Sequence, residues 1–343
     1  MRIVIVTDAW RPQVNGVVRT LEMLAGELES TGHEVRLITP EPFRTLPCPS
    51  YPEIRLSLLP GRRVAAMIED NRPCAIHIAT EGPLGWAARR YCLRRGLPYT
   101  TAYHTRFPEY VQARFGVPLA LSYAVVRRFH SRADTVMVAT ASVEADLRRH
   151  GFRHIRRWSR GVDTGLFRPG YGKVYDLPRP IFLYVGRLAV EKNIDAFLSL
   201  DLPGSKVAVG DGPLAHELKR RYPDVLFPGA KRGEELAAHY ADADVFVFPS
   251  RTDTFGLVLL EALACGVPVA AYPVAGPVDV LGGSQAGRLD EDLAKAARSA
   301  LDVPSELCRA HAMSFSWTAS TRQFIDNLSP FGSLDSPLRQ EMR

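Results

Sequence analysis

Lysine is absent from the first 168 residues of this 343-residue chain, which contain 25 arginines in its place. With 15 acidic residues this half has a net charge of +10, whereas 18 basic and 22 acidic residues give residues 169–343 a charge of −4. Two interpretations are open: ordinary solvated helix faces, or a basic surface for an anionic partner. There is no recognised nucleic-acid module and no set of interleaved stacking aromatics, so no nucleic acid is expected. An anionic membrane surface is the favoured partner.

Long apolar runs and clustered cysteines are also absent. No stretch of about 18 apolar residues could span a bilayer. The first residues, MRIVIVTDAW, are typical of a strand rather than of a secretory signal. The five cysteines are scattered, with no CxxC pair and no Cys/His cluster. This usage disfavours a disulfide framework and a zinc site, and it indicates a cytoplasmic location.

Short apolar runs alternate with helical segments in both halves of the chain. Such alternation is typical of parallel sheets covered on both faces, so we expect an α/β fold with two Rossmann-like, doubly wound sheets. Helices are expected at residues 17–31, 64–71, 85–95, 119–132 and 141–150. Strands are expected at 3–7, 35–39, 75–79, 99–102, 135–139, 181–185, 206–209, 225–227, 245–248 and 267–271.

A segment rich in glycine and proline, residues 167–180, is the expected linker. It separates a first domain, residues 1–168, from a second, residues 169–314. A last helix at 315–328 is expected to return to the first domain, and 329–343 is expected to be a flexible tail.

Two acids, Asp253 and Glu261, lie where a buried strand, a polar loop and an apolar helix follow one another. Eight positions are a little over two helical turns, so the two carboxylates can lie near one line. Phe255, Gly256 and Leu257 stand between them, where the helix N-terminus would offer free N–H groups to an anion. A nucleotide-sugar needs this set: one carboxylate for sugar hydroxyls, donors for the diphosphate, and one carboxylate for the ribose.

Two cations, Arg187 and Lys192, follow the strand expected at 181–185. Ligands of doubly wound sheets bind at the carboxyl ends of the strands. Two cations there can neutralise a diphosphate leaving group without a metal. The alternative is a surface loop with ordinary charges.

Three more residues follow neighbouring strands of the second half. Gly210 and Asp211 belong to a Gly-Asp-Gly-Pro turn that suits close approach to a flat ligand, although a plain turn explains it equally well. Lys231 follows the next strand, where backbone groups could read the edge of a base.

Two residues of the first half lie at equivalent positions. Gly16 ends the loop after the first strand, where a helix N-terminus favours negative charge, although a structural turn is an open alternative. His104 follows the strand expected at 99–102 and would face the donor, although a lone histidine is usually structural.

The pair Asp242 and Asp244 has the DxD spacing that holds a divalent metal in other transferases. Here it precedes a strand, so it would lie at the amino end of the sheet. We interpret it as a helix end and a strand start, and no metal site is predicted.

Together these segments resemble the retaining glycosyltransferases of family 4, which have the two-domain GT-B fold with the domains facing a cleft. The resemblance covers nearly the whole chain, through VNGV, ATEGPLG, YHTRF, RGVD, GRLAVEKN, GDGP and the acid pair. Within the family the chain is most similar to GDP-mannose-dependent α-mannosyltransferases and to sulfoquinovosyl- or glucosyl-diacylglycerol synthases.

The resemblance implies a role for each residue. Arg187 and Lys192 would stabilise the leaving phosphate, and His104 would lie near the sugar and the acceptor. Asp253 would hold sugar hydroxyls, although the family has Glu there, and a chain shorter by one methylene moves the carboxylate by roughly 1.5 Å. The diphosphate and nucleotide contacts would come from Gly16, Phe255, Gly256, Leu257 and, at the ribose, Glu261.

The resemblance also implies front-face substitution with no cofactor, since the nucleotide-sugar is a substrate. We expect transfer of a hexose or uronic acid from a UDP- or GDP-sugar to a membrane lipid such as diacylglycerol, at the inner face of the cell membrane. One alternative is GDP-mannose transfer to a polyprenyl-linked or soluble glycan. Two others are a non-catalytic nucleotide-binding module and an oxidoreductase, although the latter lacks GxGxxG.

Overall fold

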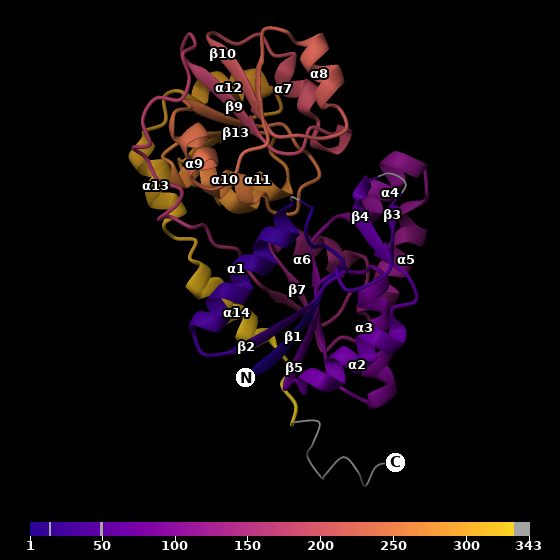
Figure 1. The fold of residues 1–343 in the computed structure, drawn as a ribbon. Helices are drawn as coiled ribbons and strands as arrows, with labels where there is room; N and C mark the ends of the chain where they lie inside the picture. Colours follow the sequence, from indigo (N-terminus) through magenta and orange to yellow (C-terminus); the bar gives the residue numbers. More distant parts are fainter. Residues whose placement is uncertain (14, 49–50, 333–343) are drawn as a thin grey trace. The chain divides into compact units, whose positions relative to one another are not determined.

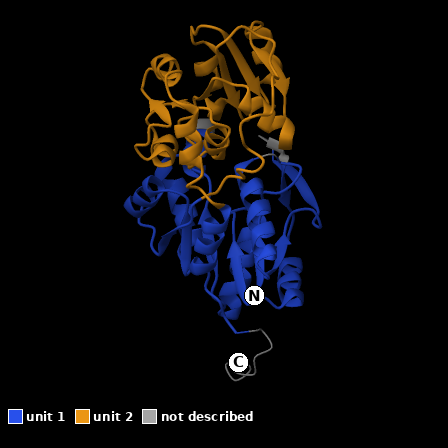
Figure 2. Ribbon diagram, turned by 90° about the vertical axis from the view of Figure 1, so that its left-hand side faces the viewer, with its two compact units in different colours: residues 1–159, 317–343 blue, residues 160–316 orange. Residues whose placement is uncertain are grey.

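The computed structural model describes residues 1–13, 15–48 and 51–332. It divides the chain into two compact units (Figure 2). Unit 1 comprises Met1–Ser159 and Trp317–Arg343, and unit 2 comprises Arg160–Ser316.

Unit 1 is built on a six-stranded parallel sheet with strand order β2-β1-β5-β6-β7-β8 (Figure 1). Side chains of β1 alternate between two cores, because successive residues of a strand point to opposite faces. Val4 and Val6 belong to one core, and Ile3 and Ile5 belong to the other. The strands are β1 (Arg2–Val6), β2 (Glu34–Ile38), β5 (Ala75–Ile78), β6 (Thr100–Tyr103), β7 (Thr135–Val138) and β8 (Ile155–Arg157).

Helices cover both faces of the unit 1 sheet. Apolar residues of α2, α3, α5 and α6 pack with Val4 and Val6, whereas α1 and α14 pack with Ile3 and Ile5. The helices are α1 (Gly16–Ser30), α2 (Gly61–Asn71), α3 (Pro83–Arg95), α4 (Phe107–Phe115), α5 (Leu119–His130), α6 (Ala141–Arg149) and α14 (Trp317–Asn327).

Unit 2 repeats the plan with a parallel sheet of order β11-β10-β9-β12-β13-β14. Its strands are β9 (Ile181–Val185), β10 (Ser205–Val209), β11 (Leu226–Gly229), β12 (Val245–Phe248), β13 (Val269–Ala271) and β14 (Gly287–Leu289). Its helices are η1 (Val190–Lys192), α7 (Ile194–Leu198), α8 (Ala215–Arg221), α9 (Gly233–Ala241), α10 (Leu257–Ala264), α11 (Ala275–Leu281), α12 (Leu293–Ala300) and α13 (Ser305–Ala312).

The predicted fold class, two doubly wound parallel sheets, is confirmed. The sequence pattern did not predict helix α4, the antiparallel pair β3 (Thr45–Cys48) and β4 (Tyr51–Ser57), or the edge strands β8 and β14. Each edge strand has three residues. A run of that length shows no periodicity that distinguishes it from a loop.

The division between the units falls after Ser159, whereas the linker composition placed it after residue 168. Hydrogen bonds explain the difference. Val162 N–H donates to the carbonyl of Phe315 at 3.1 Å, and the Arg309 guanidinium donates to the carbonyls of Thr164 and Phe167 at 3.3 and 3.2 Å. These bonds attach residues 162–167, the end of the predicted first domain and the first residue of the predicted linker, to unit 2.

The last helix, α14, belongs to unit 1 although it follows unit 2 in the chain. It lies beside α1 (Figure 1). Phe324 and Leu328 are buried in the same core as Ile3 and Ile5. Ser320 donates a hydrogen bond to the carbonyl of Ser159 at 2.7 Å, which ties the helix to the end of the first segment.

Candidate active site

The strand order of unit 2 defines where a ligand would bind. The chain leaves β9 toward β10 and β11, and later leaves the adjacent β12 toward β13 and β14. The carboxyl ends of β9 and β12 therefore flank a topological switch point, the usual ligand position in open α/β sheets. Two side-chain bonds hold the loops that follow these strands together. Asn193 donates to the carbonyl of Pro249 at 3.1 Å, and Thr252 donates to that of Glu191 at 3.2 Å.

Lys192 and Asp253 form an ion pair across this switch point. Lys192 Nζ lies 2.5 Å from Asp253 Oδ1, and the two side chains are 24% and 17% exposed. The second carboxylate oxygen, Oδ2, is buried and has no hydrogen-bond partner among the residues that the structure describes. Buried carboxylate oxygens are normally hydrogen-bonded, so this oxygen can accept a bond from a ligand hydroxyl.

A hydrogen bond from β9 fixes the backbone of Arg187. The buried Tyr184 hydroxyl donates to the carbonyl of Arg187 at 2.8 Å. A Cβ on Gly186 would lie 2.7 Å from that hydroxyl, so glycine is required for the approach. Burial raises the pKa of Tyr184 well above its usual range, so the phenol remains a neutral donor.

The N-terminus of α10 begins at the same edge of the sheet. Gly256 is its N-cap, with a left-handed φ of 86° and no side chain to bond the first N–H groups. Phe255 is buried, and its ring centroid lies 6.4 Å from that of Phe315. Leu257 is the first residue of α10, so the uncapped N–H groups that can face an anion belong to the turn that begins at Leu257, directly after Phe255 and Gly256.

Glu261 has a different environment from Asp253. It lies within α10 and is 4% exposed. The hydroxyl of Tyr240, on α9, donates to its Oε2 at 3.0 Å. Of the two acids of the predicted motif, Asp253 lies at the switch point and Glu261 is buried inside unit 2.

Gly210, directly after β10, packs closely against the backbone at the ends of the neighbouring strands β9 and β11. A Cβ there would lie 1.9 Å from the carbonyl oxygen of Gly186, and Gly210 N–H donates to the carbonyl of Gly229 at 3.0 Å. Asp211 is exposed, and its carboxylate accepts from Gly212 N–H at 2.7 Å. Lys231 pairs with Glu235 at 2.5 Å.

The sequence reasoning assigned no role to Asp8, which proves to be a central residue of unit 1. Its carboxylate follows β1 and accepts from Leu84 and Gly85 N–H at 2.8 and 3.2 Å and from the Thr80 hydroxyl at 3.0 Å. These bonds cap α3 across the β1–β5 switch point. Burial raises the pKa of Asp8 to about 6. The sequence did contain a signal for this contact: Asp8 and Thr80 directly follow the strands expected at 3–7 and 75–79.

The predicted unit 1 residues follow β1 and β6. Gly16 is the first residue of α1, and Asn15 is its N-cap. Asn15 Oδ1 accepts from Val17 and Val18 N–H at 3.0 Å each, so these amides already have a partner. The His104 ring packs edge-on to Trp158, with centroids 5.7 Å apart.

The DxD pair lies at the amino end of the unit 2 sheet, as the sequence predicts. Asp242 caps α9 and accepts from Val174 and Tyr175 N–H at 2.6 and 2.7 Å. Arg179 binds Asp242 and also Asp244, the latter at 2.8 Å. Both carboxylates therefore hold the linker. No cluster of three or more His, Cys, Asp or Glu suited to a metal occurs in residues 1–13, 15–48 and 51–332.

Two family models match this chain. The model described as Glycosyltransferase Family 4 matches residues 14–166, and that described as Glycosyl transferases group 1 matches residues 179–303. The two matches fall on the two parallel sheets, whose switch points have just been described. The chain belongs to glycosyltransferase family 4, so it is an enzyme, a hexosyltransferase with the GT-B fold.

Curated relatives span most of the chain. The sulfoquinovosyl transferase SQD2 of Arabidopsis thaliana is 28% identical over 90% of this chain and 69% of its own length. A GDP-mannose-dependent alpha-mannosyltransferase of Mycobacterium tuberculosis is 31% identical over 84% of this chain and 83% of its own. The alpha-monoglucosyldiacylglycerol synthase of Streptococcus pneumoniae is 28% identical over 79% and 71%.

A solved structure shows the same fold. The sucrose-phosphate synthase of Thermosynechococcus elongatus superposes with a TM-score of 0.75 at 23% identity, covering 95% of this chain and 97% of that one. None of the helices in the described part of this chain is long and apolar enough to cross a membrane.

Proposed function

We propose that the protein transfers a hexose or uronic acid, with retention of configuration, from a UDP- or GDP-sugar to a membrane lipid such as diacylglycerol. The observation that carries the proposal is the Lys192–Asp253 pair at the β9–β12 switch point, with a buried oxygen of Asp253 left to accept a hydroxyl. A site for a diphosphate alone would need only the cation, Lys192. A sugar hydroxyl, which can donate a hydrogen bond, also explains the buried acceptor oxygen of Asp253.

The donor would be bound through the loops after β9 and β12. The N–H groups at the start of α10 and the cations Arg187 and Lys192 would hold the diphosphate. Asp253 would accept from sugar hydroxyls, and Glu261 would serve the ribose. Gly210, Asp211 and Lys231, which follow β10 and β11, would contact the nucleotide.

Transfer would proceed by front-face substitution. The bond between the anomeric carbon and the phosphate oxygen breaks as an oxocarbenium-like centre develops. The acceptor hydroxyl forms the new glycosidic bond from the same face and gives its proton to the departing phosphate oxygen. Arg187 and Lys192 would stabilise the charge that grows on the diphosphate. On the unit 1 side, His104 would contact sugar and acceptor, and Gly16 would contact the diphosphate.

Two observations support a lipid acceptor. One relative is named for diacylglycerol, and residues 1–168 contain 25 arginines against 15 acidic residues. A basic surface is attracted to anionic leaflets. We place the enzyme in the cytoplasm, bound peripherally to the inner face of the cell membrane.

GDP-mannose transfer to a polyprenyl-linked or soluble glycan is the second candidate. It is favoured by the 31% identity with a GDP-mannose-dependent alpha-mannosyltransferase over 84% of this chain. The two candidates differ in donor base and acceptor, while the residues at the switch point would act alike in both.

A panel experiment separates the candidates. The full chain is incubated with UDP- and GDP-sugars and a bacterial lipid extract, and products are identified by mass spectrometry, with NMR for the anomeric configuration. A new α-glycosyl lipid from an α-linked donor supports the proposal. A β-linked product would overturn retention, and a product found only with glycan acceptors would favour the second candidate.

We also propose that transfer needs no metal, because two cationic side chains follow β9. Dialysis against EDTA is expected to leave the rate within about twofold of the untreated enzyme. A loss of activity that Mg²⁺ or Mn²⁺ restores would contradict this prediction.

A further inference from the structure

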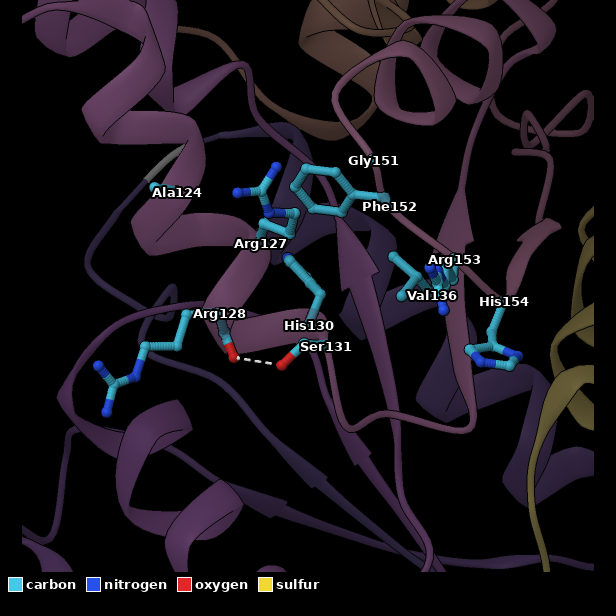
Figure 3. A pocket seen from close by; sticks show the side chains of 10 residues that line it. All are labelled: Ala124, Arg127, Arg128, His130, Ser131, Val136, Gly151, Phe152, Arg153 and His154. Carbon is cyan, nitrogen blue, oxygen red and sulfur yellow. Dashed lines mark hydrogen bonds between the residues drawn. The ribbon is translucent and has the colours of Figure 1, made fainter.

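Unit 1 contains a pocket of about 390 Å³ between the end of α5 and the turn that joins α6 to β8 (Figure 3). The segments that line it precede β7 and β8, so it lies at the amino end of the sheet. The loops that carry Gly16 and His104 follow β1 and β6, at the carboxyl end. The pocket is therefore separate from the candidate active site.

Three arginines, Arg127, Arg128 and Arg153, line the pocket together with His130 and His154. Arg127 donates to the carbonyl of His150 at 3.0 Å, which fixes one guanidinium at the rim. Arg128 and Arg153 have no ion-pair partner within the described part of the chain.

Few acidic side chains lie near the pocket: Asp134 stands between the lining residues Ser131 and Val136 and is exposed, and Glu81 Oε1 lies 3.1 Å from Nε2 of the lining residue His130. Residues 119–133 and 147–162 contain no Asp or Glu. The two acids of α6 are paired with arginines of the same helix: Glu144 with Arg148 at 2.8 Å, and Asp146 with Arg149 at 3.1 Å. The pocket thus keeps a positive potential that suits an anion of phosphate size.

The pocket also has an apolar side, and α5 extends it. Phe152 and Val136 line the pocket and are 5% and 1% exposed. On the outer surface of α5, Leu121 is 60% and Val125 is 52% exposed. These two residues are four positions apart and Arg128 is three further on, so the three lie on one side of the helix.

The exposed apolar residues continue onto α4, which contacts α5. Phe107 is 53% and Phe115 is 63% exposed. Contiguous exposed apolar side chains mark a binding surface in a monomeric protein. A soluble phosphate would use the arginines but would leave the apolar side chains in water.

We propose that this pocket binds the phosphate of an anionic phospholipid while Leu121 and Val125 of α5 enter the interfacial layer of the bilayer. Amphipathic helices with arginine beside apolar residues bind membranes in this way. The helix α5 runs antiparallel to the strands, so its start and the neighbouring α4 lie at the carboxyl end of the sheet, near His104. A bilayer along α5 would therefore reach the acceptor side of unit 1, and in this respect the inference rests on the proposed lipid acceptor.

Vesicle flotation of the full chain tests the proposal. The protein is expected to float with vesicles of phosphatidylcholine and phosphatidylglycerol at low salt, but not with phosphatidylcholine alone. The double variant Arg128→Glu/Arg153→Glu should bind the mixed vesicles at least about tenfold more weakly, because each arginine near an anionic surface contributes about 1 kcal/mol. Leu121→Ser/Val125→Ser, which leaves the charge unchanged, should also weaken binding.

The matched control is Arg90→Glu/Arg94→Glu, which makes the same charge change on the exposed face of α3. It should keep most of the binding. Equal losses in both charge-reversal variants would mean that diffuse charge alone attracts the membrane, and the pocket would have no specific role. Calorimetric binding of inorganic phosphate that Arg128→Glu/Arg153→Glu abolishes, with vesicle binding unchanged, would identify a soluble-anion site and overturn the proposal.

A second measurement separates this inference from the proposed function. Sugar transfer to a detergent-dispersed lipid acceptor does not require docking on a bilayer, so Arg128→Glu/Arg153→Glu should retain wild-type turnover there. Normal turnover together with unchanged flotation would refute the docking surface and leave the proposed function standing. Specific flotation without transfer to any lipid would refute the lipid acceptor and leave the docking surface standing.

Discussion

At the residue scale, Lys192 and Asp253 depend on each other. Each side chain is partly exposed, and the pair is a single neutral unit when no ligand is bound. A diphosphate would compete with Asp253 for the ammonium group, and a sugar hydroxyl would bind the other oxygen of the carboxylate. The net value of the ion pair for stability is small at this exposure, so its position at the switch point is better explained by function.

Replacement of Lys192 should therefore affect activity more than folding. Lys192→Ala is expected to lower kcat by about 10²–10³-fold, the usual loss when one group that stabilises developing charge is removed. Lys219→Ala, at an exposed lysine of α8, is the matched control. Steady-state kinetics with the identified donor measure the effect, and thermal unfolding checks the fold. Turnover near that of the wild type in Lys192→Ala would refute the assigned role.

At the element scale, the buried Asp8 couples β1 to the start of α3. Its carboxylate acts as a helix cap from a distant part of the chain, and a Cβ on Gly82 would lie only 2.3 Å from its Cγ. The carboxylate thereby links the end of β1 to the start of α3 across the β1–β5 switch point. The N-cap of α3 is Gly82, which has no side chain, so the Asp8 carboxylate accepts the hydrogen bonds that an N-cap side chain would normally accept.

The raised pKa of Asp8 predicts how the stability of unit 1 changes with pH. In the unfolded chain the pKa of this carboxyl is near its ordinary value of 3.8, whereas burial raises the pKa to about 6 in the folded protein. The unfolded state thus binds fewer protons between about pH 4 and 6, so the free energy of unfolding falls by up to about 3 kcal/mol as pH rises through this window. Below it, both states are protonated and the contribution is constant.

Asp8→Asn should remove this pH dependence, because an amide does not titrate. Urea unfolding at pH values from about 4 to 7 should show the variant gaining about 3 kcal/mol relative to wild type across the window. All four tryptophans lie in unit 1, so their fluorescence follows this unit. A constant difference between the two proteins would contradict the prediction.

At the scale of the whole molecule, the chain enters unit 2 once and then returns. The return helix α14 helps to cover one face of the unit 1 sheet, and Phe324 is the largest of its fully buried side chains. The ring of Phe324 is fully buried, with centroids 5.0 Å from Trp158 and 4.9 Å from His77. Unit 1 therefore depends on residues that follow unit 2 in the chain.

Phe324→Ala should lower the free energy of unfolding of unit 1 by about 3–5 kcal/mol, as other buried aromatic truncations do. Arg322→Ala, an exposed position on the same helix, should change it by less than about 0.5 kcal/mol. Tryptophan fluorescence during urea unfolding measures both. Equal midpoints for Phe324→Ala and wild type would mean that α14 contributes no stability to unit 1.

The sequence by itself determined the fold class and which segments form the strands that precede the candidate site residues. Those features follow from local patterns: apolar runs of strand length, helices between them, and glycine or charged residues in the loops after several of the runs. Arg187, Lys192 and Asp253 could be proposed because each follows a strand, and parallel strands bring their carboxyl ends to one edge.

Only the tertiary structure decided which of these residues meet. Lys192 and Asp253 are 61 positions apart, and their ion pair exists because β9 and β12 are adjacent in the sheet. The same reason applies to Asp8 and the start of α3. It also applies to the burial of Glu261 beside Tyr240 and to the pocket between α5 and the α6–β8 turn. Contacts between distant segments depend on strand order and on close packing, and neither leaves a periodic signal in the sequence.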